Sequence, residues 1–227
     1  MMNYELCLLF IRQMKILLLT ATEMEIKPLL KEFTFLKNKV DVLITGPGMI
    51  STVYHLTKRF NEIKYDLAIN AGIAGSFSKK ITLGSVVQVK EECFSELGAE
   101  DDKNFIHVSD MKFKGKDDFF LIKKYAVNKT KIKSKTCFQL QKVKGITVNT
   151  VHGNKLNIEK IKRIFNPEIE TMEGAAFFYV CEKEKIPFIQ VRAISNYVEK
   201  RDKSKWKTDE AINNLCKTLR GVLEEMS

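Results

Sequence analysis

The sequence contains no long hydrophobic run, and this absence limits where the protein acts. No stretch approaches the roughly 18 consecutive apolar residues that a membrane-spanning helix needs. The N-terminal run LCLLFI is short, follows no basic segment and precedes no small-residue cleavage site. We therefore expect no signal peptide and no membrane partner.

Cysteine is scarce as well, and its spacing argues against a metal centre. The five cysteines lie far apart in the chain, are odd in number and include no CxxC pair. Zinc sites and disulfide frameworks need closer or paired cysteines. We expect no metal ion and a reducing, cytoplasmic location.

The formal net charge is +10, and few aromatic residues are placed to stack on bases where that charge is densest. Residues 112–144 hold most of the closely spaced lysines but few aromatics that could stack on bases. The other lysines fall where solvated helix faces and loops are expected. We expect no nucleic-acid partner, since an anionic small substrate or solubility accounts for the charge equally well.

Apolar residues are abundant enough for a folded core, and their pattern predicts an α/β fold. They make up 44% of the 227 residues, which suits a globular protein of this length. Strand patterns alternate with helical periodicity, as in folds built on a largely parallel sheet. Strands are predicted at 15–20, 40–46, 65–70, 84–94, 137–153 and 186–194, and helices at 21–33, 47–60, 154–165, 172–185 and 208–226.

Two segments fall outside this regular alternation. The strand at 15–20 is much cleaner than the run before it, so we expect residues 1–13 to be an N-terminal extension and residues 14–227 to form one domain. Residues 95–135 are polar, rich in lysine and weakly periodic, and we expect loops with a short helix around 118–125. A long irregular stretch in a compact domain usually has a function.

The stretch 170–196, ETMEGAAFFYVCEKEKIPFIQVRAISN, joins a helix to a strand and carries two notable polar residues. Thr171 is a predicted helix cap. The buried helix face would contain Met172, Ala175, Ala176 and Tyr179. Glu173 lies in the first turn, where unpaired N–H groups favour a carboxylate. Asn196 follows the strand, at the edge where open α/β sheets place a ligand.

These two residues suit a nucleoside. The carboxylate of Glu173 can accept a hydrogen bond from each hydroxyl of a ribose, and the amide of Asn196 can donate to or accept from a flat heterocycle. Glu25 and the glycine turns GPGM and AGIAG belong to the same carboxyl edge of the sheet. The alternative is that both acids merely suit a first helical turn and that Asn196 is a turn residue.

A set of motifs in order makes the chain resemble the purine nucleoside phosphorylase and nucleosidase superfamily: MKILLLTATEME, ITGPGM, NAGIAGSF, LGSVV, TVNT, ETMEGAA and VRAISN. The resemblance covers nearly everything from Met14 onward and is strongest to the hydrolytic branch. It implies a three-layer α/β/α sandwich around a central mixed, partly barrel-like sheet. It also implies a small nucleoside substrate, no cofactor and a homodimer in which helices of one subunit close the other's site.

The resemblance implies roles for individual residues. Glu25 falls where the nucleosidases hold the acid that activates water. Met172 and Glu173 match the methionine under the ribose and the glutamate on its hydroxyls. The backbone of Gly72 and Ile73 matches the turn that lines the water and ribose side.

The base-binding end departs from the methylthioadenosine branch. Asn196, preceded by Ser195 in VRAISN, stands where those enzymes carry an aspartate. An amide can give an N–H to O6 or N7 of a 6-oxopurine, so we expect a hypoxanthine-type base. FSELGAED and ISNYVEKRDKSKW are similar to the futalosine hydrolases, which release hypoxanthine from futalosine in the alternative menaquinone pathway. Phe94 would then lie near the base, although a core aromatic is its more frequent role.

The sequence also indicates whether water or phosphate is the nucleophile of the reaction. TATEMEIK and AINAGIAG contain no arginine, whereas the phosphorylases of the superfamily hold phosphate with arginines in these regions. Glu25 would repel phosphate and suits a water, so we expect hydrolysis. The alternatives are a methylthioadenosine/S-adenosylhomocysteine nucleosidase, opposed mainly by Asn196, and a non-catalytic nucleoside-binding protein.

The far end of futalosine carries a benzoate, which needs a cation or a donor. Arg192, His152 and the lysines of residues 95–135 are candidates, and Arg192 could equally pair with a buried carboxylate. His55 and His107 are expected on the surface or in the core, because no ligand-type spacing links them.

Overall fold

The structure is a computed structural model that describes residues 14–31, 40–111 and 123–226. The expected extension at 1–13 lies outside the described residues, as does most of the helix expected at 118–125. Among the described residues, no helix combines the length and the apolar character needed to cross a membrane.

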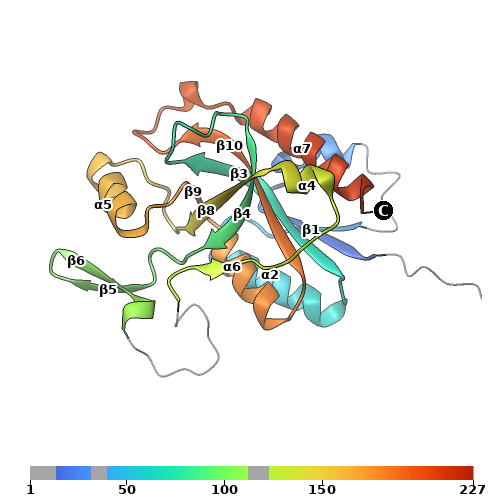
Figure 1. Ribbon diagram of the computed structural model, residues 1–227, viewed down its shortest axis with the longest axis horizontal. Helices are drawn as coiled ribbons and strands as arrows, with labels where there is room; N and C mark the ends of the chain where they lie inside the picture. Colours follow the sequence, from blue (N-terminus) through green and yellow to red (C-terminus); the bar gives the residue numbers. More distant parts are fainter. Residues whose placement is uncertain (1–13, 32–39, 112–122, 227) are drawn as a thin grey trace, which may run out of the picture.

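A closed mixed sheet forms the centre of the fold (Figure 1). Strand β10 pairs with both β4 and β3, and the order β10-β4-β8-β9-β3 therefore closes into a ring. Strands β1 and β2 extend the sheet in parallel beyond β3, and β7 pairs with β4. The strands are β1 (Ile16–Thr20), β2 (Val40–Ile44), β3 (Leu67–Ser76), β4 (Val86–Glu92), β7 (Ala126–Val127), β8 (Gln141–Thr147), β9 (Ile169–Thr171) and β10 (Phe188–Tyr197).

Helices cover two faces of this sheet, which confirms the three-layer prediction. Helices α2 (Met49–Glu62) and α6 (Gly174–Lys183) pack together on one face. Helix α7 (Thr208–Glu224) covers the other, joined by α1 (Lys27–Leu30) and α4 (Lys135–Gln139), while α5 (Lys155–Phe165) lies beside β8 and β9 (Figure 1). The strand period of two explains the layers, because Leu17 and Leu19 pack with α6 whereas Ile16 and Leu18 pack with α7.

The segment expected to be irregular contains a hairpin of β5 (Gly98–Asp101) and β6 (Asn104–His107), followed by a 3-10 turn at Val108–Asp110. The hairpin projects from the body of the molecule (Figure 1). Its strands pair only with each other in the described parts of the chain. Short polar strands of this kind carry too few apolar residues to be recognised by periodicity.

The stretch 170–196 differs from its prediction at both ends. Helix α6 begins at Gly174, so Glu173 is its N-cap and Thr171 ends β9. The hydroxyl of Thr171 still accepts a hydrogen bond from the Gly174 N–H at 3.2 Å. Strand β10 continues past a register shift and includes Asn196, because parallel pairing with β3 extends to Tyr197.

Three further predictions were wrong in local detail. The helix predicted at 21–33 is a 3-10 turn at Glu23–Glu25 followed by the short α1, whose second residue is Pro28. The strand predicted at 137–153 begins only at Gln141, since Ser134 caps α4 by accepting from the Cys137 N–H. The third strand is longer than predicted, because the small residues of AGIAGS stay in β3.

Candidate active site

Glu25 is held rigidly at the end of β1. Its Oε2 accepts hydrogen bonds from the Thr20 hydroxyl at 3.0 Å, the Thr22 N–H at 3.0 Å and the Thr22 hydroxyl at 3.1 Å. Its Oε1 accepts from the Ile73 N–H of β3 at 3.0 Å. The residue is buried, so these donors and not water orient the carboxylate.

Glu173 is the second buried carboxylate of the site. Its Oε1 accepts from the N–H of Gly48 at 3.0 Å. Gly48 precedes α2 with a φ of 95°, which a residue with a side chain rarely adopts. The Oε2 atom of Glu173 lies 3.6 Å from Nη2 of Arg192, which forms a buried ion pair.

Arg192 is the largest fully buried side chain, and it lies beside both carboxylates. It pairs in register with Gly72 of β3. A Cβ at position 72 would collide with Nη1 of Arg192 and lie 2.7 Å from Oε1 of Glu25. Gly72 therefore leaves the space in which the guanidinium approaches Glu25. The guanidinium makes no hydrogen bond with the described residues, so its N–H groups remain available.

Asn196 has a defined amide orientation. Its Oδ1 accepts from the Ser195 hydroxyl at 2.8 Å, and its Nδ2 donates to the Tyr197 carbonyl at 3.1 Å. Each bond uses one of the two hydrogen-bonding positions of its atom, so one N–H and one lone pair remain for a ligand. Ser195 is buried and acts here as the donor that sets this orientation.

One cavity of about 330 Å³ brings most of the predicted residues together. Of the predicted site residues, Glu25, Ile73, Met172, Glu173, Ser195 and Asn196 line it. Gly72 is not among the lining residues and serves by admitting Arg192. Phe94 also does not line this cavity. It packs edge-to-face on Tyr179 at 6.5 Å against the core, so the structure does not support its expected place near the base.

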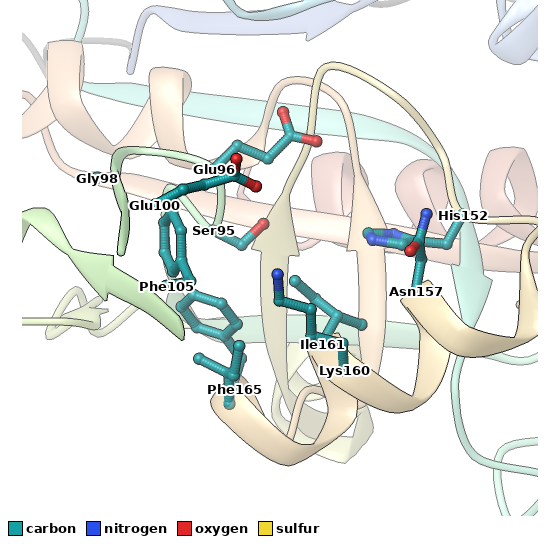
Figure 2. A pocket seen from close by; sticks show the side chains of 11 residues that line it. Ser95, Glu96, Gly98, Glu100, Phe105, His152, Asn157, Lys160, Ile161 and Phe165 are labelled. Atoms are coloured by element: carbon teal, nitrogen blue, oxygen red, sulfur yellow. The ribbon is translucent and has the colours of Figure 1, made fainter. Parts of the chain in front are cut away.

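A second cavity, of about 360 Å³, lies between the β5–β6 hairpin and α5 (Figure 2). Phe105, Ile161 and Phe165 give it an apolar wall, while Glu96, Glu100 and Lys160 are polar groups around it. His152 is at its edge and also belongs to the Asn196 end of the first site. The second cavity lacks the pair of buried carboxylates, so we place the chemistry in the first.

Several lining residues were missed by the sequence analysis. Glu170, Arg201 and Trp206 line the cavity near Asn196. The guanidinium of Arg201 lies over the Trp206 ring at 5.0 Å. The signal for Trp206 was its place as the only tryptophan of the chain, ten positions beyond Asn196 in a loop. Glu170 could be found only through the strand pairing.

His55 and His107 both lie away from the cavity, one on the surface and one in the interior. His55 is exposed on α2 and His107 is buried, with its pKa lowered by burial. Neither lines the cavity. Among the described residues no cluster of His, Cys, Asp and Glu side chains could hold a metal ion.

The barrel, the flanking helices and the cavity with two buried carboxylates define the class of the protein as an enzyme with the nucleoside phosphorylase and nucleosidase fold. The family described as the Phosphorylase superfamily matches residues 24–225. The chain belongs to this superfamily.

Relatives of known name are nucleosidases. The chain is 26% identical to futalosine hydrolase of Thermus thermophilus over 189 residues, which cover 81% of this chain and 80% of the relative. It is 27% identical to 5'-methylthioadenosine/S-adenosylhomocysteine nucleosidase of Buchnera aphidicola over 203 residues, 86% of this chain and 83% of the relative. Nucleosidases are N-glycosidases, and the protein is an enzyme of this kind.

Solved structures share the fold at lower identity. The methylthioadenosine/S-adenosylhomocysteine nucleosidase of Colwellia psychrerythraea, in complex with adenine, has a TM-score of 0.75 at 16% identity and covers 95% of this chain and 96% of its own. Futalosine hydrolase of Helicobacter pylori has a TM-score of 0.74 at 14% identity, and the match covers 93% of this chain and 98% of that structure's chain. These matches show a shared fold.

Proposed function

We propose that this protein hydrolyses the N-glycosidic bond of a 6-oxopurine nucleoside, with futalosine as its substrate. The observation that carries the proposal is the pair of buried carboxylates, Glu25 and Glu173, next to the Arg192 guanidinium at one cavity. Hydrolysis of a nucleoside needs a base for water and groups that stabilise charge on the ribose. The similarity to futalosine hydrolase supports the choice of substrate.

Glu25 is the proposed general base. Three donors occupy Oε2, whereas Oε1 accepts only from the Ile73 N–H. Oε1 therefore has a free lone pair for the proton of a water. As the bond from ribose carbon 1 to N9 breaks, its electron pair goes to the base. The water oxygen bonds to carbon 1, and a proton of the water passes to Glu25. Solvent supplies the proton that the departing purine acquires.

Glu173 and Arg192 hold the other reacting groups. The Gly48 N–H fixes one oxygen of Glu173, and the remaining lone pairs can accept from ribose hydroxyls. Negative charge on Glu173 also favours the positive charge that develops on the ribose ring. The guanidinium of Arg192 pairs with Glu173 and lies next to Glu25, so its positive charge offsets the charges of the two neighbouring carboxylates.

Water is favoured over phosphate as the nucleophile by the charges around the cavity. Arg201 is the cation among its lining residues, and it is exposed at the Asn196 end. Phosphate near Glu25 would face two buried carboxylates, whereas the nearby Arg192 is paired with Glu173 and does not line the cavity. At separations of about 4 Å, such repulsion costs several kcal/mol in a buried site.

The candidates for the benzoate end are fewer than the sequence indicated. Arg192 is fully buried and paired with Glu173, which agrees with the alternative that it is the partner of a buried carboxylate. His152 is bound to Glu170. Part of the lysine-rich segment lies outside the described residues. Arg201 lines the cavity with an exposed guanidinium, but it does so at the Asn196 end, where the purine and not the benzoate is proposed to bind.

The protein is proposed to work as a cytoplasmic homodimer. Ile50 and Tyr54 lie one turn apart on α2 and are 85% and 62% exposed. The same helix begins next to Gly48, which binds Glu173. A partner that covers this face would lie beside the ribose end of the site. The four described cysteines are free and buried, which suits a reducing compartment.

Purine release in phosphate-free buffer tests the proposed function. Futalosine, methylthioadenosine and inosine are incubated separately, and the bases are separated by chromatography. Hypoxanthine from futalosine is the expected product. Adenine from methylthioadenosine at an equal or higher rate would favour the second candidate, the nucleosidase activity named for the Buchnera aphidicola relative. No release from any substrate would refute hydrolysis.

A further inference from the structure

Glu170 and His152 form a buried acid–histidine pair at the Asn196 end of the cavity. The Oε1 atom of Glu170 accepts from the His152 backbone N–H at 3.0 Å, and its Oε2 lies 2.7 Å from His152 Nδ1. Glu170 is 4% exposed, and its side chain lines the same space as Asn196. Neither residue takes part in the proposed activation of water or in the binding of the ribose.

Strand register places Glu170 and Asn196 on either side of Gly75. Gly75 pairs with Glu170 of β9 on one side and with Asn196 of β10 on the other. Neighbouring strands lie about 4.8 Å apart, so the two flanking Cα atoms are about 10 Å apart. A Cβ at Gly75 would lie 3.3 Å from Nδ2 of Asn196 and 3.5 Å from Cγ of Glu170. Both side chains therefore lie on the same side of the sheet as the space that Gly75 leaves open.

That space has the hydrogen-bonding character of a binding site for a flat heterocycle. An ionised carboxylate only accepts hydrogen bonds, while the amide of Asn196 keeps one N–H free. Each oxygen of Glu170 has one lone pair in use by His152 and one that remains. A ligand over Gly75 thus meets a donor at one edge and an acceptor at the other.

We propose that Glu170, positioned by His152, selects the 6-oxopurine by accepting a hydrogen bond from its N1–H. This inference rests on the proposed function and names a determinant of its substrate class. When Asn196 donates to O6 or N7, the hydrogen-bonding group that follows O6 along the same edge of the base is N1. A 6-oxopurine carries a proton there, whereas a 6-aminopurine presents a lone pair that would face the carboxylate. Buried polar groups left unmatched in this way discriminate by roughly 100-fold or more.

His152 is a positioning residue in this proposal. Its backbone N–H and its ring together direct the carboxylate, with Nδ1 donating to Oε2. The His152 side chain is itself 12% exposed, so the pair is shielded from solvent that would otherwise compete for Glu170. Loss of the ring is expected to loosen the carboxylate and to weaken discrimination without removing the acceptor.

The test compares kcat/KM for inosine and adenosine, which share a sugar and differ at positions 1 and 6. The wild-type protein is expected to favour inosine by at least 100-fold. Glu170→Gln supplies an amide N–H to adenine N1, so the ratio should fall at least tenfold through a loss on inosine and a gain on adenosine. His152→Ala should reduce the ratio less. Glu168→Gln is the matched control, because that carboxylate binds the Lys144 N–H and does not line the cavity.

Equal losses on both substrates in Glu170→Gln would show a structural role and overturn the inference, while leaving hydrolysis in place. If no nucleoside is hydrolysed, calorimetric titration with free hypoxanthine and free adenine separates the two proposals. Tighter binding of hypoxanthine that Glu170→Gln abolishes would support the inference without hydrolysis, and equal binding would refute it. Glu170→Asp replaces the glutamine variant if that variant fails to fold. It withdraws the acceptor and should reduce inosine turnover selectively.

Discussion

The guanidinium of Arg192 lies 3.6 Å from the Glu173 carboxylate at a position that solvent does not reach. A cation is costly to bury unless it is paired, and here Glu25 stands on its other side across the space left by Gly72. The site is therefore a charged triad of two carboxylates, Glu25 and Glu173, and one guanidinium, Arg192.

Replacing Glu25 with glutamine is expected to lower kcat by about 10²–10⁴-fold, because the amide cannot take a proton from water. The melting temperature should also fall, because the NH2 group of glutamine must face either the Ile73 N–H or the donors that hold Oε2. Glu23→Gln, in the same turn but exposed, is the control and should retain activity. Steady-state hypoxanthine release measures both, and full activity in Glu25→Gln would refute its role as base.

Replacing Arg192 with methionine should reduce the free energy of unfolding by about 3–5 kcal/mol, because buried carboxylates lose their cation. The double variant Arg192→Met/Glu173→Gln should recover part of this loss. Urea denaturation at pH 7 measures the three proteins. A double variant no more stable than the single one would show that the charge pairing is not the cause.

Gly72→Ala should be destabilised by about 1–3 kcal/mol and lose activity, because the added methyl group displaces Arg192 and crowds Glu25. Gly153→Ala is the matched control, since its nearest neighbours to an added Cβ are at 3.9 Å or more. Thermal unfolding and kcat/KM are measured for both variants. Equal behaviour of the two variants would contradict the close approach at position 72.

The stability of the protein should depend on pH because Glu92 is a buried carboxyl group. It is fully buried against Gln190 and Thr147, and burial raises its pKa from an ordinary 4.5 to about 7. The folded state then binds more protons than the unfolded state between these values. The free energy of unfolding therefore falls by about 3 kcal/mol as pH rises through this window.

Glu92→Gln should remove the pH-dependent contribution of Glu92. The free energy of unfolding of the variant, relative to that of the wild-type protein, should therefore rise between pH 5 and pH 8. Gln190 has an unpartnered Oε1 and can turn its amide to accept from the new side chain. Urea denaturation at several pH values measures the difference. Parallel pH profiles for the two proteins would mean that Glu92 does not titrate in this range.

Ile50→Asp is expected to convert the proposed homodimer to a monomer with reduced activity, since a charge on an apolar interface leaves an unpaired buried group. Phe138→Asp is the control, because Phe138 is 83% exposed on α4 and away from α2. Light scattering after size exclusion gives the mass of each variant. A monomeric wild-type protein would refute the homodimer directly.

The order of elements and the edge of the sheet that carries the site could be predicted from sequence. Alternating strands and helices place the ends of β1, β3 and β10 together, so the sequence could predict that Glu25 and Asn196 lie at one edge of the sheet. Thr171 has the chemistry of a cap, which explains why the start of α6 was predicted too early.

Strand register could not be predicted, and it decides the remaining partners. Arg192 approaches Glu25 because it lies opposite Gly72, and Glu170 lines the cavity because β9 pairs with β3. These pairings join segments far apart in the chain, and local patterns carry no information about them. Phe94, which was expected near the base with a core role as the alternative, packs on Tyr179 against the core and does not line the cavity.

Strand β3 serves the site almost entirely through its main chain. It supplies the Ile73 N–H, the space at Gly72 and the open surface at Gly75, while its neighbours supply the acids, the amide and the guanidinium. The backbone of one strand is thus a fixed platform, and the chemistry is carried by replaceable side chains on either flank. New base preferences could therefore evolve, or be engineered, through exchanges on β9 and β10 without rebuilding the barrel.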